Sequence, residues 1–169
     1  KIHTTDMFAY FVEPIKSQLL AKNLKESEPR AGKIDYDIDG RLAGNWFVEN
    51  TNWYSGLTQQ GPNYWKTHLS FAYDGIDPTL IMISIGDYNG ESKQFAVKGN
   101  LPDPDDVSIS NGIVKYELTD YDYKDGTGQF WDRRSYAKGV KAFGGSRVDG
   151  VALVQMVGDR NIKFEVFPR

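Results

Sequence analysis

The chain passes from a mixed N-terminal segment into a β-rich domain at the stretch Arg41-Leu42-Ala43-Gly44-Asn45-Trp46-Phe47-Val48-Glu49. Gly44 stands two residues before Trp46, and an aromatic and β-branched pair follows, which is typical of a strand. We interpret Gly44 as a point of close backbone approach and Trp46 as a core residue. This stretch is therefore predicted to be the first full strand of an all-β domain.

Downstream of Lys33 the hydrophobic pattern acquires the period of two that half-buried strands show. Apolar residues alternate or run together over 34–38, 69–73, 80–85, 95–97, 113–119, 151–157 and 162–167. Turn sequences separate these runs, and Asn89-Gly90 is a strong hairpin signal. Residues 122–148 are polar and Gly-rich, and are predicted to be loop with one short strand near 129–131. The pattern predicts a mainly β fold, a single antiparallel barrel of about eight strands, with a two-sheet sandwich as the alternative.

The first 32 residues have a different character and are predicted to be an N-terminal helical appendage to a barrel domain over 33–169. Ile15, Leu19 and Leu20 share one face of a helix expected over Pro14–Asn23. Residues 80–85 and 151–157 are apolar on both faces, so both faces must be covered. The N-terminal segment is the expected cover on the outside of the barrel.

Composition excludes several classes of function. The formal net charge of −3 leaves no basic excess to neutralise phosphates, so nucleic acid is not a predicted partner. The absence of Cys excludes disulfides, thiolate zinc sites and Cys nucleophiles. No apolar run approaches the ~20 residues of a membrane-spanning helix. Because the chain begins at Lys1 rather than Met, either a signal segment was removed or the chain is an excised part of a longer one; we expect an exported protein, extracellular or periplasmic.

Two short motifs resemble those of the lipocalin family within the calycins. Gly44-Asn45-Trp46 resembles the Gly-x-Trp that opens the first lipocalin strand, and Thr119-Asp120-Tyr121 resembles a Thr-Asp-Tyr that ends a later one. In that family an Arg after the last strand packs across the Trp. Arg169 would take this place in a closed barrel, whereas Arg160 falls in the last predicted hairpin. The resemblance implies a barrel that binds a small apolar or amphipathic ligand without catalysis.

The polar segment 50–65 is the candidate ligand-binding surface. Large aromatics among amide side chains are typical of sugar recognition, because a ring stacks on the apolar sugar face while amides bond the hydroxyls; an aromatic plug at one end of the barrel is the alternative. A second wall is expected at 129–133. The predicted ligand-binding residues are Trp53, Tyr54, Tyr64, Trp65 and Trp131.

No catalytic residue, metal ligand or cofactor is predicted from the motifs. The chain has two His, His3 and His68, and neither a Gly-x-Ser-x-Gly turn nor an H-E-x-x-H pair accompanies them. Residues 35–40 match the first half of a calcium loop, but Trp46 stands where the bidentate Glu is required. The sequence favours a non-enzymatic binding domain. A carbohydrate-binding module, a structural domain of a larger exported protein, and a hydrolase or lyase with paired carboxylates are the alternatives.

Overall fold

The computed structural model describes residues 6–23, 30, 37–56, 64–135 and 137–169. Within these residues the fold is mainly β, as predicted, and little of it is helical. Seven antiparallel strands form the main sheet: β1 (Gly44–Phe47), β2 (His68–Tyr73), β3 (Ile81–Tyr88), β4 (Glu91–Val97), β5 (Ile113–Thr119), β8 (Gly150–Gly158) and β9 (Asn161–Pro168). Two more, β6 (Tyr121–Lys124) and β7 (Lys141–Gly144), form a second small sheet.

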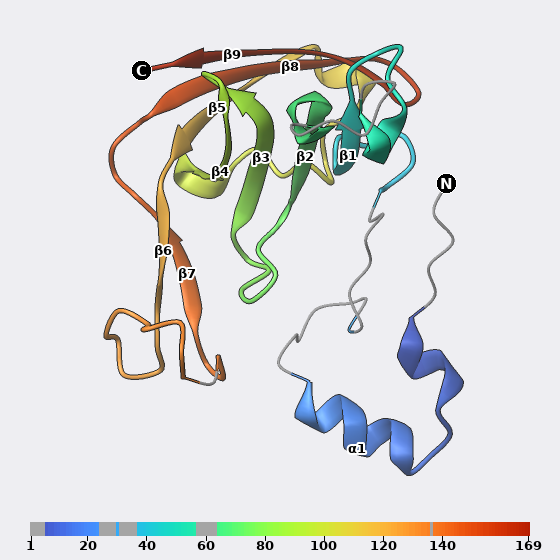
Figure 1. The fold of residues 1–169 in the computed structure, drawn as a ribbon, viewed down its shortest axis with the longest axis vertical. Coiled ribbons are helices and arrows are strands. Elements are labelled where there is room, and N and C mark those ends of the chain that lie inside the picture. The colour runs from blue at the N-terminus through green and yellow to red at the C-terminus, as the bar shows by residue number, and fades with distance from the viewer. Residues whose placement is uncertain (1–5, 24–29, 31–36, 57–63, 136) are drawn as a thin grey trace.

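The main sheet is an open, curled half-barrel. Its strand order is β1-β2-β3-β4-β5-β8-β9, and in Figure 1 the β8–β9 hairpin runs across the top of the other strands. In the described part of the chain the ladder ends at β1 on one side and at β9 on the other, with no backbone pairing between the two. The structure therefore differs from the closed barrel predicted above. An open seam separates the edge strands β1 and β9.

The concave face of the half-barrel holds the main hydrophobic core. Each inner strand contributes alternate residues, as the period of two predicts. Fully or almost fully buried side chains there include Leu42, Trp46, Phe71, Ile83, Phe95, Tyr116, Leu118, Ala152 and Val154. The loop between β4 and β5 is tied to the residues just before β1, because the Leu42 N–H donates to the Val107 carbonyl at 2.9 Å. Leu42 and Val107 are both part of this core.

Gly44 and Trp46 have the roles that the sequence predicts. Trp46 is 5% exposed and lies in the core, and its indole Nε1–H donates to the Leu42 carbonyl at 2.9 Å. Gly44 has a φ of +142°, and a Cβ at this position would collide with the Asp37 carboxylate. Only glycine therefore fits here, because a side chain would be both strained and sterically blocked.

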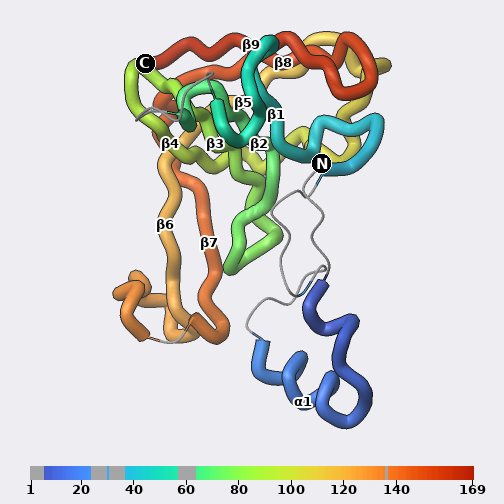
Figure 2. Tube along the Cα trace, turned by 45° about the vertical axis from the view of Figure 1, so that its right-hand side comes forward, coloured from blue at the N-terminus to red at the C-terminus, as the bar shows by residue number. Residues whose placement is uncertain are grey.

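The β6–β7 hairpin lies where the sequence predicts a loop. Leu80, just before β3, Met82 of β3 and Ala96 of β4 lie on the convex face and pack against Tyr121 and Ala142 of this hairpin. Figures 1 and 2 show its far end projecting away from the main sheet. The expected short strand near 129–131 is reduced to a single bridge between Phe130 and Lys124. The sequence pattern does not reveal these strands, because each is only four residues long and a long polar segment separates them.

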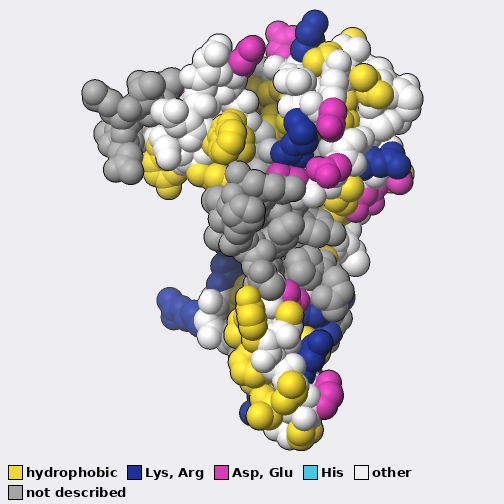
Figure 3. Space-filling view, turned by 90° about the vertical axis from the view of Figure 1, so that its right-hand side faces the viewer, with side chains coloured by type: hydrophobic (Ala, Val, Ile, Leu, Met, Phe, Trp, Pro, Cys, Tyr) yellow, Lys and Arg dark blue, Asp and Glu magenta, His cyan; other side chains and the backbone are white. Residues whose placement is uncertain are grey.

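The predicted N-terminal helix is confirmed, but its predicted position is wrong. Helix α1 (Ile15–Lys22) begins after Pro14 and ends before Asn23, and none of its residues is buried. In Figures 1 and 2 it lies away from the main sheet, together with the 3-10 helix η1 (Met7–Tyr10). The convex face is covered by β6–β7 instead. Figure 3 shows hydrophobic side chains gathered at this N-terminal end. The exposed hydrophobic residues of this part of the chain include Met7, Tyr10, Val12 and Ile15.

Two further points of the sequence analysis concern the first part of the domain. The predicted strand alternation over 34–38 lies mostly outside the described residues, and Asp37 and Ile38 belong to no strand. The Asn89-Gly90 hairpin is confirmed: both residues have positive φ, 60° and 94°, between β3 and β4. Among the described residues, no helix is both long and apolar enough to cross a bilayer.

Candidate functional site

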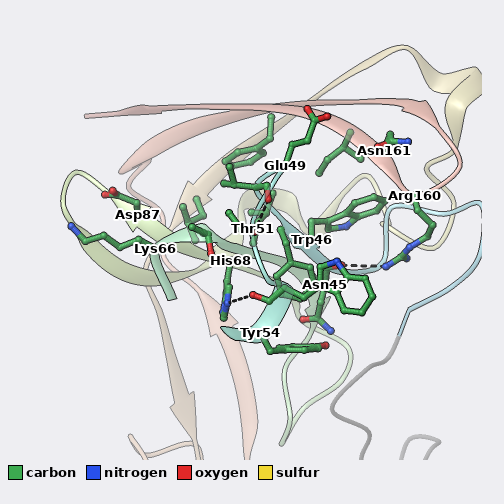
Figure 4. Close-up of a pocket in the computed structure, with 18 of the residues that line it drawn as sticks. Asn45, Trp46, Glu49, Thr51, Tyr54, Lys66, His68, Asp87, Arg160 and Asn161 are labelled. Atoms are coloured by element: carbon green, nitrogen blue, oxygen red, sulfur yellow. Dashed lines mark hydrogen bonds between the residues drawn. The ribbon is translucent and has the colours of Figure 1, made fainter. Parts of the chain in front are cut away.

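A cleft of about 1080 Å³ opens along the seam between β1 and β9. Its described lining comes from β1, the 3-10 helix η2 (Trp53–Ser55), the beginning of β2, the end of β3, and β9. Figure 4 shows these side chains converging from several elements on one space beneath β9. We call this space the seam cleft.

The apolar part of the seam cleft is a consequence of the open ladder. Ile162, Phe164 and Val166 point to the concave face and pack against the core, yet each stays only half-buried. They do so because β9 is the last strand and has a neighbour on one side only. Leu69 and Ile85 extend the same apolar surface. A closed barrel would have covered these side chains, whereas the half-barrel leaves them accessible.

One end of the seam is held together by an arginine. Arg160, in the β8–β9 turn, lies over the Trp46 ring with its guanidinium carbon 4.8 Å from the ring centroid. Its Nη2 is 2.8 Å from the Asp37 carboxylate and donates to the Asn45 carbonyl at 3.3 Å, a contact drawn in Figure 4. Asp37 also accepts the Asn45 N–H at 2.7 Å. We call these four residues the arginine clasp, and it joins β1 to the β8–β9 hairpin through side chains rather than a backbone ladder.

The clasp replaces the arrangement that the lipocalin resemblance implies for Arg169. The Arg169 backbone N–H donates to the Asp149 carbonyl at 2.8 Å, at the opposite end of β9 from Arg160. The arginine on Trp46 therefore comes from a hairpin turn and not from beyond the last strand. The left-handed backbone of Arg160, with φ of 59°, belongs to the tight turn that presents its side chain.

An aromatic wall forms the side of the cleft nearest β2. The Phe47 ring packs edge-on against Tyr54 and His68, with centroids 4.8 and 5.2 Å apart. His68 Nε2 lies 3.1 Å from the Trp53 carbonyl, a hydrogen bond that ties η2 to β2. Trp53 is 63% exposed and adopts a left-handed φ of 51°. The packing places a bulky aromatic at the rim in a conformation that such residues rarely adopt.

Four of the five predicted ligand-binding residues lie in one region of the structure. Trp53 and Tyr54 line the seam cleft. Tyr54 and Trp65 line a second hollow of about 690 Å³, and Tyr121 of β6 is also part of its lining. Tyr64 lies in the 3-10 helix η3 (Tyr64–Thr67) and packs against Trp65 and His68 at 5.3 and 5.7 Å between centroids. The structure thus brings these four into one neighbourhood, although residues 57–63 lie outside the described residues.

Trp131 lies apart from the other four. It belongs to the β6–β7 hairpin, where its ring contacts Tyr123 at 5.8 Å and its Nε1–H donates to Ser135 Oγ at 3.0 Å. It lines neither the seam cleft nor the second hollow among their described residues. The predicted second wall at 129–133 is therefore not part of either space.

Charged side chains at the seam cleft are mostly acidic. The described lining includes the acidic residues Asp37, Asp39, Glu49, Asp87 and Glu165 and the basic residues Lys66 and Arg160. Glu165 alternates with Phe164 and Val166 along β9, so its carboxylate lies on the opposite face of the sheet. Asp37 and Arg160 pair with each other in the clasp. Three acidic residues, Asp39, Glu49 and Asp87, then remain against one basic residue, Lys66. No three His, Cys, Asp or Glu side chains among the described residues are grouped to hold a metal ion.

Comparison with known proteins finds no family model, curated protein or solved structure that matches this chain. The assignment of the site therefore rests on its own geometry. Sequence reasoning missed Arg160 and the β9 residues as parts of the site. The clean alternation of Ile162, Phe164 and Val166 predicts one apolar face, but it does not reveal that β9 is an edge strand.

Proposed function

We propose that this protein is a non-enzymatic binding domain that takes a small amphipathic ligand in the seam cleft. The observation that carries the proposal is the half-buried apolar face of β9, which borders a hollow of about 1080 Å³. This volume lies just above the ~300–1,000 Å³ typical of small-molecule sites. The cleft combines an apolar floor with a polar rim, the usual composition of such sites.

Burial of apolar surface supplies the affinity. Each methylene group that an aliphatic ligand buries contributes ~0.8 kcal/mol. A ligand along Ile162, Phe164 and Val166 would cover the surface that the missing pairing of β9 leaves open. The resemblance of Gly44-Asn45-Trp46 to the lipocalin opening supports the same proposal, because in that family the corresponding strand borders a ligand-binding barrel.

The test uses a neutral apolar probe, Nile red, added to the full chain. Its fluorescence should rise on binding, and the melting temperature of the protein should increase in excess 1-octanol, because a ligand that binds only the folded state stabilises it. Trp53→Ala should weaken the binding of both, whereas Trp131→Ala should leave it unchanged. Trp131 is the matched control, since it lies on the β6–β7 hairpin. Equal loss in both variants, or no binding by the unmodified chain, would reject the proposal.

A carbohydrate ligand is the second candidate. It is favoured by the 63% exposure of Trp53 at a rim that also carries Asn45, Asn50 and Thr51. An exposed indole can stack on a sugar ring while amides and hydroxyls bond its hydroxyl groups. Retention on insoluble polysaccharide columns tests this candidate. It should be lost in Trp53→Ala and kept in Trp131→Ala, and absence of retention on any column contradicts it.

A further inference from the structure

We infer that the seam cleft is selective for cationic amphiphiles, molecules with an ammonium or guanidinium head and an apolar body. The inference rests on the proposed function, since it names the chemical class of the ligand for the same cleft. The apolar body would lie against the floor formed by β9, and the cationic head would stand at the rim near Trp53 and the carboxylates. Two independent observations support this assignment of charge.

The first observation is the charge of the rim. With the Asp37–Arg160 pair and the outward-facing Glu165 set aside, the described lining has Asp39, Glu49 and Asp87 against Lys66. All three of these acidic residues are exposed to solvent. They border an apolar floor, and the low dielectric of that floor strengthens their field inside the cleft. A cationic head is attracted there and an anionic head is repelled.

The second observation is that the cleft already accommodates a cation in this way. At the clasp, a guanidinium lies over an indole ring at 4.8 Å and a carboxylate pairs with it at 2.8 Å. The residues that line the cleft also include the same two components away from the clasp, a Trp53 ring that is 63% exposed and the acidic residue Glu49 on the segment that follows β1. Trp is the aromatic side chain that attracts cations most strongly. The rim can therefore hold a ligand cation by the chemistry that Arg160 shows at the clasp.

The decisive experiment compares three probes that share an eight-carbon tail: octyltrimethylammonium, octanoate and octyl glucoside. Each is titrated below its micelle concentration against the full chain, with tryptophan fluorescence and calorimetry as readouts. The cation should bind at least about tenfold more tightly than octanoate, with octyl glucoside between them. Raising the ionic strength from about 0.02 M to about 0.5 M should reduce the affinity for the cation and leave that for octyl glucoside unchanged.

Variants then locate the charge that gives the selectivity. Glu49→Gln and Asp87→Asn should each lower the affinity for octyltrimethylammonium about two- to fivefold, the range of exposed ion pairs, without changing that for octyl glucoside. Glu91→Gln is the matched control, because Glu91 is exposed in the β3–β4 hairpin and is not part of the described lining.

The outcomes separate the two proposals. If all three probes bind with equal affinity, or the rim variants behave like Glu91→Gln, charge selectivity is wrong and the apolar cleft stands. If octanoate binds most tightly, the inferred charge of the ligand is reversed and the inference is again rejected. If none of the probes binds, the proposed function fails, and the inference fails with it.

Discussion

Two apolar surfaces of the main sheet lie outside its core, and they differ in whether the chain itself covers them. On the convex side, Leu80, Met82 and Ala96 are buried beneath the β6–β7 hairpin. On the concave side, the β9 residues Ile162 and Phe164 stay half-buried at the seam cleft. A single sheet thus carries one apolar surface that its own chain seals and one that its chain leaves open. The difference points to the open surface as the one available for a ligand.

Polar contacts hold the β6–β7 hairpin against the convex side of the main sheet. Asp77 is 2% exposed and accepts the Ala142 N–H at 3.0 Å, while Lys141 lies 3.6 Å from its carboxylate. The Tyr123 hydroxyl donates to Asp74 at 2.5 Å. These bonds anchor the β6–β7 hairpin to the turn between β2 and β3. Among the described residues, the arginine clasp is the corresponding polar contact across the seam, and it lies at one end of it.

The largest loss of stability is expected for a residue that is buried beneath the β6–β7 hairpin. Met82→Ala removes a side chain that is 6% exposed beneath the hairpin, and should lower the free energy of unfolding by ~2–4 kcal/mol. Ile162→Ala, in the half-buried floor of the cleft, should cost only about 1 kcal/mol, because less surface and a smaller cavity are involved. Urea unfolding measures both. Equal losses would mean that the two surfaces are equally sealed.

The next effect concerns the polar anchor of the hairpin. Burial would raise the pKa of the Asp77 carboxyl, but hydrogen bonds from Thr79 and Ala142 and the nearby Lys141 ammonium together hold that pKa below its usual 3.8. The stabilisation by Asp77 is therefore complete above about pH 4 and is lost as the pH falls through the lowered pKa. Asp77→Asn should cost ~1–3 kcal/mol at pH 7, because the amide cannot satisfy all these partners.

Asp77→Asn should also make the free energy of unfolding less dependent on pH under acidic conditions. Below about pH 4 the unmodified chain should lose unfolding free energy more steeply than Asp77→Asn, as followed by urea unfolding at stepped pH. Asp159→Asn, in the exposed β8–β9 turn, is the control and should reproduce the unmodified curve. Parallel acid limbs for Asp77→Asn and the unmodified chain would show that Asp77 is not the titrating anchor.

The sequence predicts the elements of this comparison better than their arrangement. Alternation identifies the strands of the main sheet, and the N-terminal helix follows from Pro14 and the apolar face after it. The apolar character of 80–85 on both faces indicates that a cover exists. It does not identify the cover, because β6 and β7 are four residues long and 16 residues separate them.

For the candidate site as well, the sequence predicts some features and not others. Aromatic composition alone indicates the neighbourhood of Trp53, Tyr54, Tyr64 and Trp65, since local chain proximity keeps them together. Trp131 is distant because a hairpin, invisible in the pattern, carries it away. Arg160 joins Trp46 through a contact between residues far apart in the chain, which depends on how the sheet curls. Curvature and closure are global properties that local periodicity does not determine.

A smaller effect is expected at the clasp. Arg160→Asn keeps a residue that tolerates a left-handed backbone but removes the contacts with Trp46 and Asp37. The loss should be ~0.5–1.5 kcal/mol, the sum of a cation–π contact and a partly exposed ion pair. Tryptophan emission should shift to the red as water reaches Trp46. Arg134→Asn, at an exposed site on the hairpin, should change neither quantity, and a similar response in both variants would exclude a specific clasp.

The smallest change should have the opposite sign. Trp53 is 63% exposed, yet it occupies a left-handed φ of 51°, which is unfavourable by roughly 1–2 kcal/mol for a side chain with a Cβ. Trp53→Gly relieves this strain and gives up little burial, so the free energy of unfolding should rise by about 0.5–1 kcal/mol while binding in the cleft is lost. Trp131→Gly should instead destabilise the chain, because Trp131 lacks the positive φ and packs on Tyr123. A gain in stability together with a loss of binding is the result expected if Trp53 serves ligand binding rather than the stability of the fold. A loss of both would instead make Trp53 a structural residue of the rim, and the contrast between the sealed and the open surface would then need another explanation.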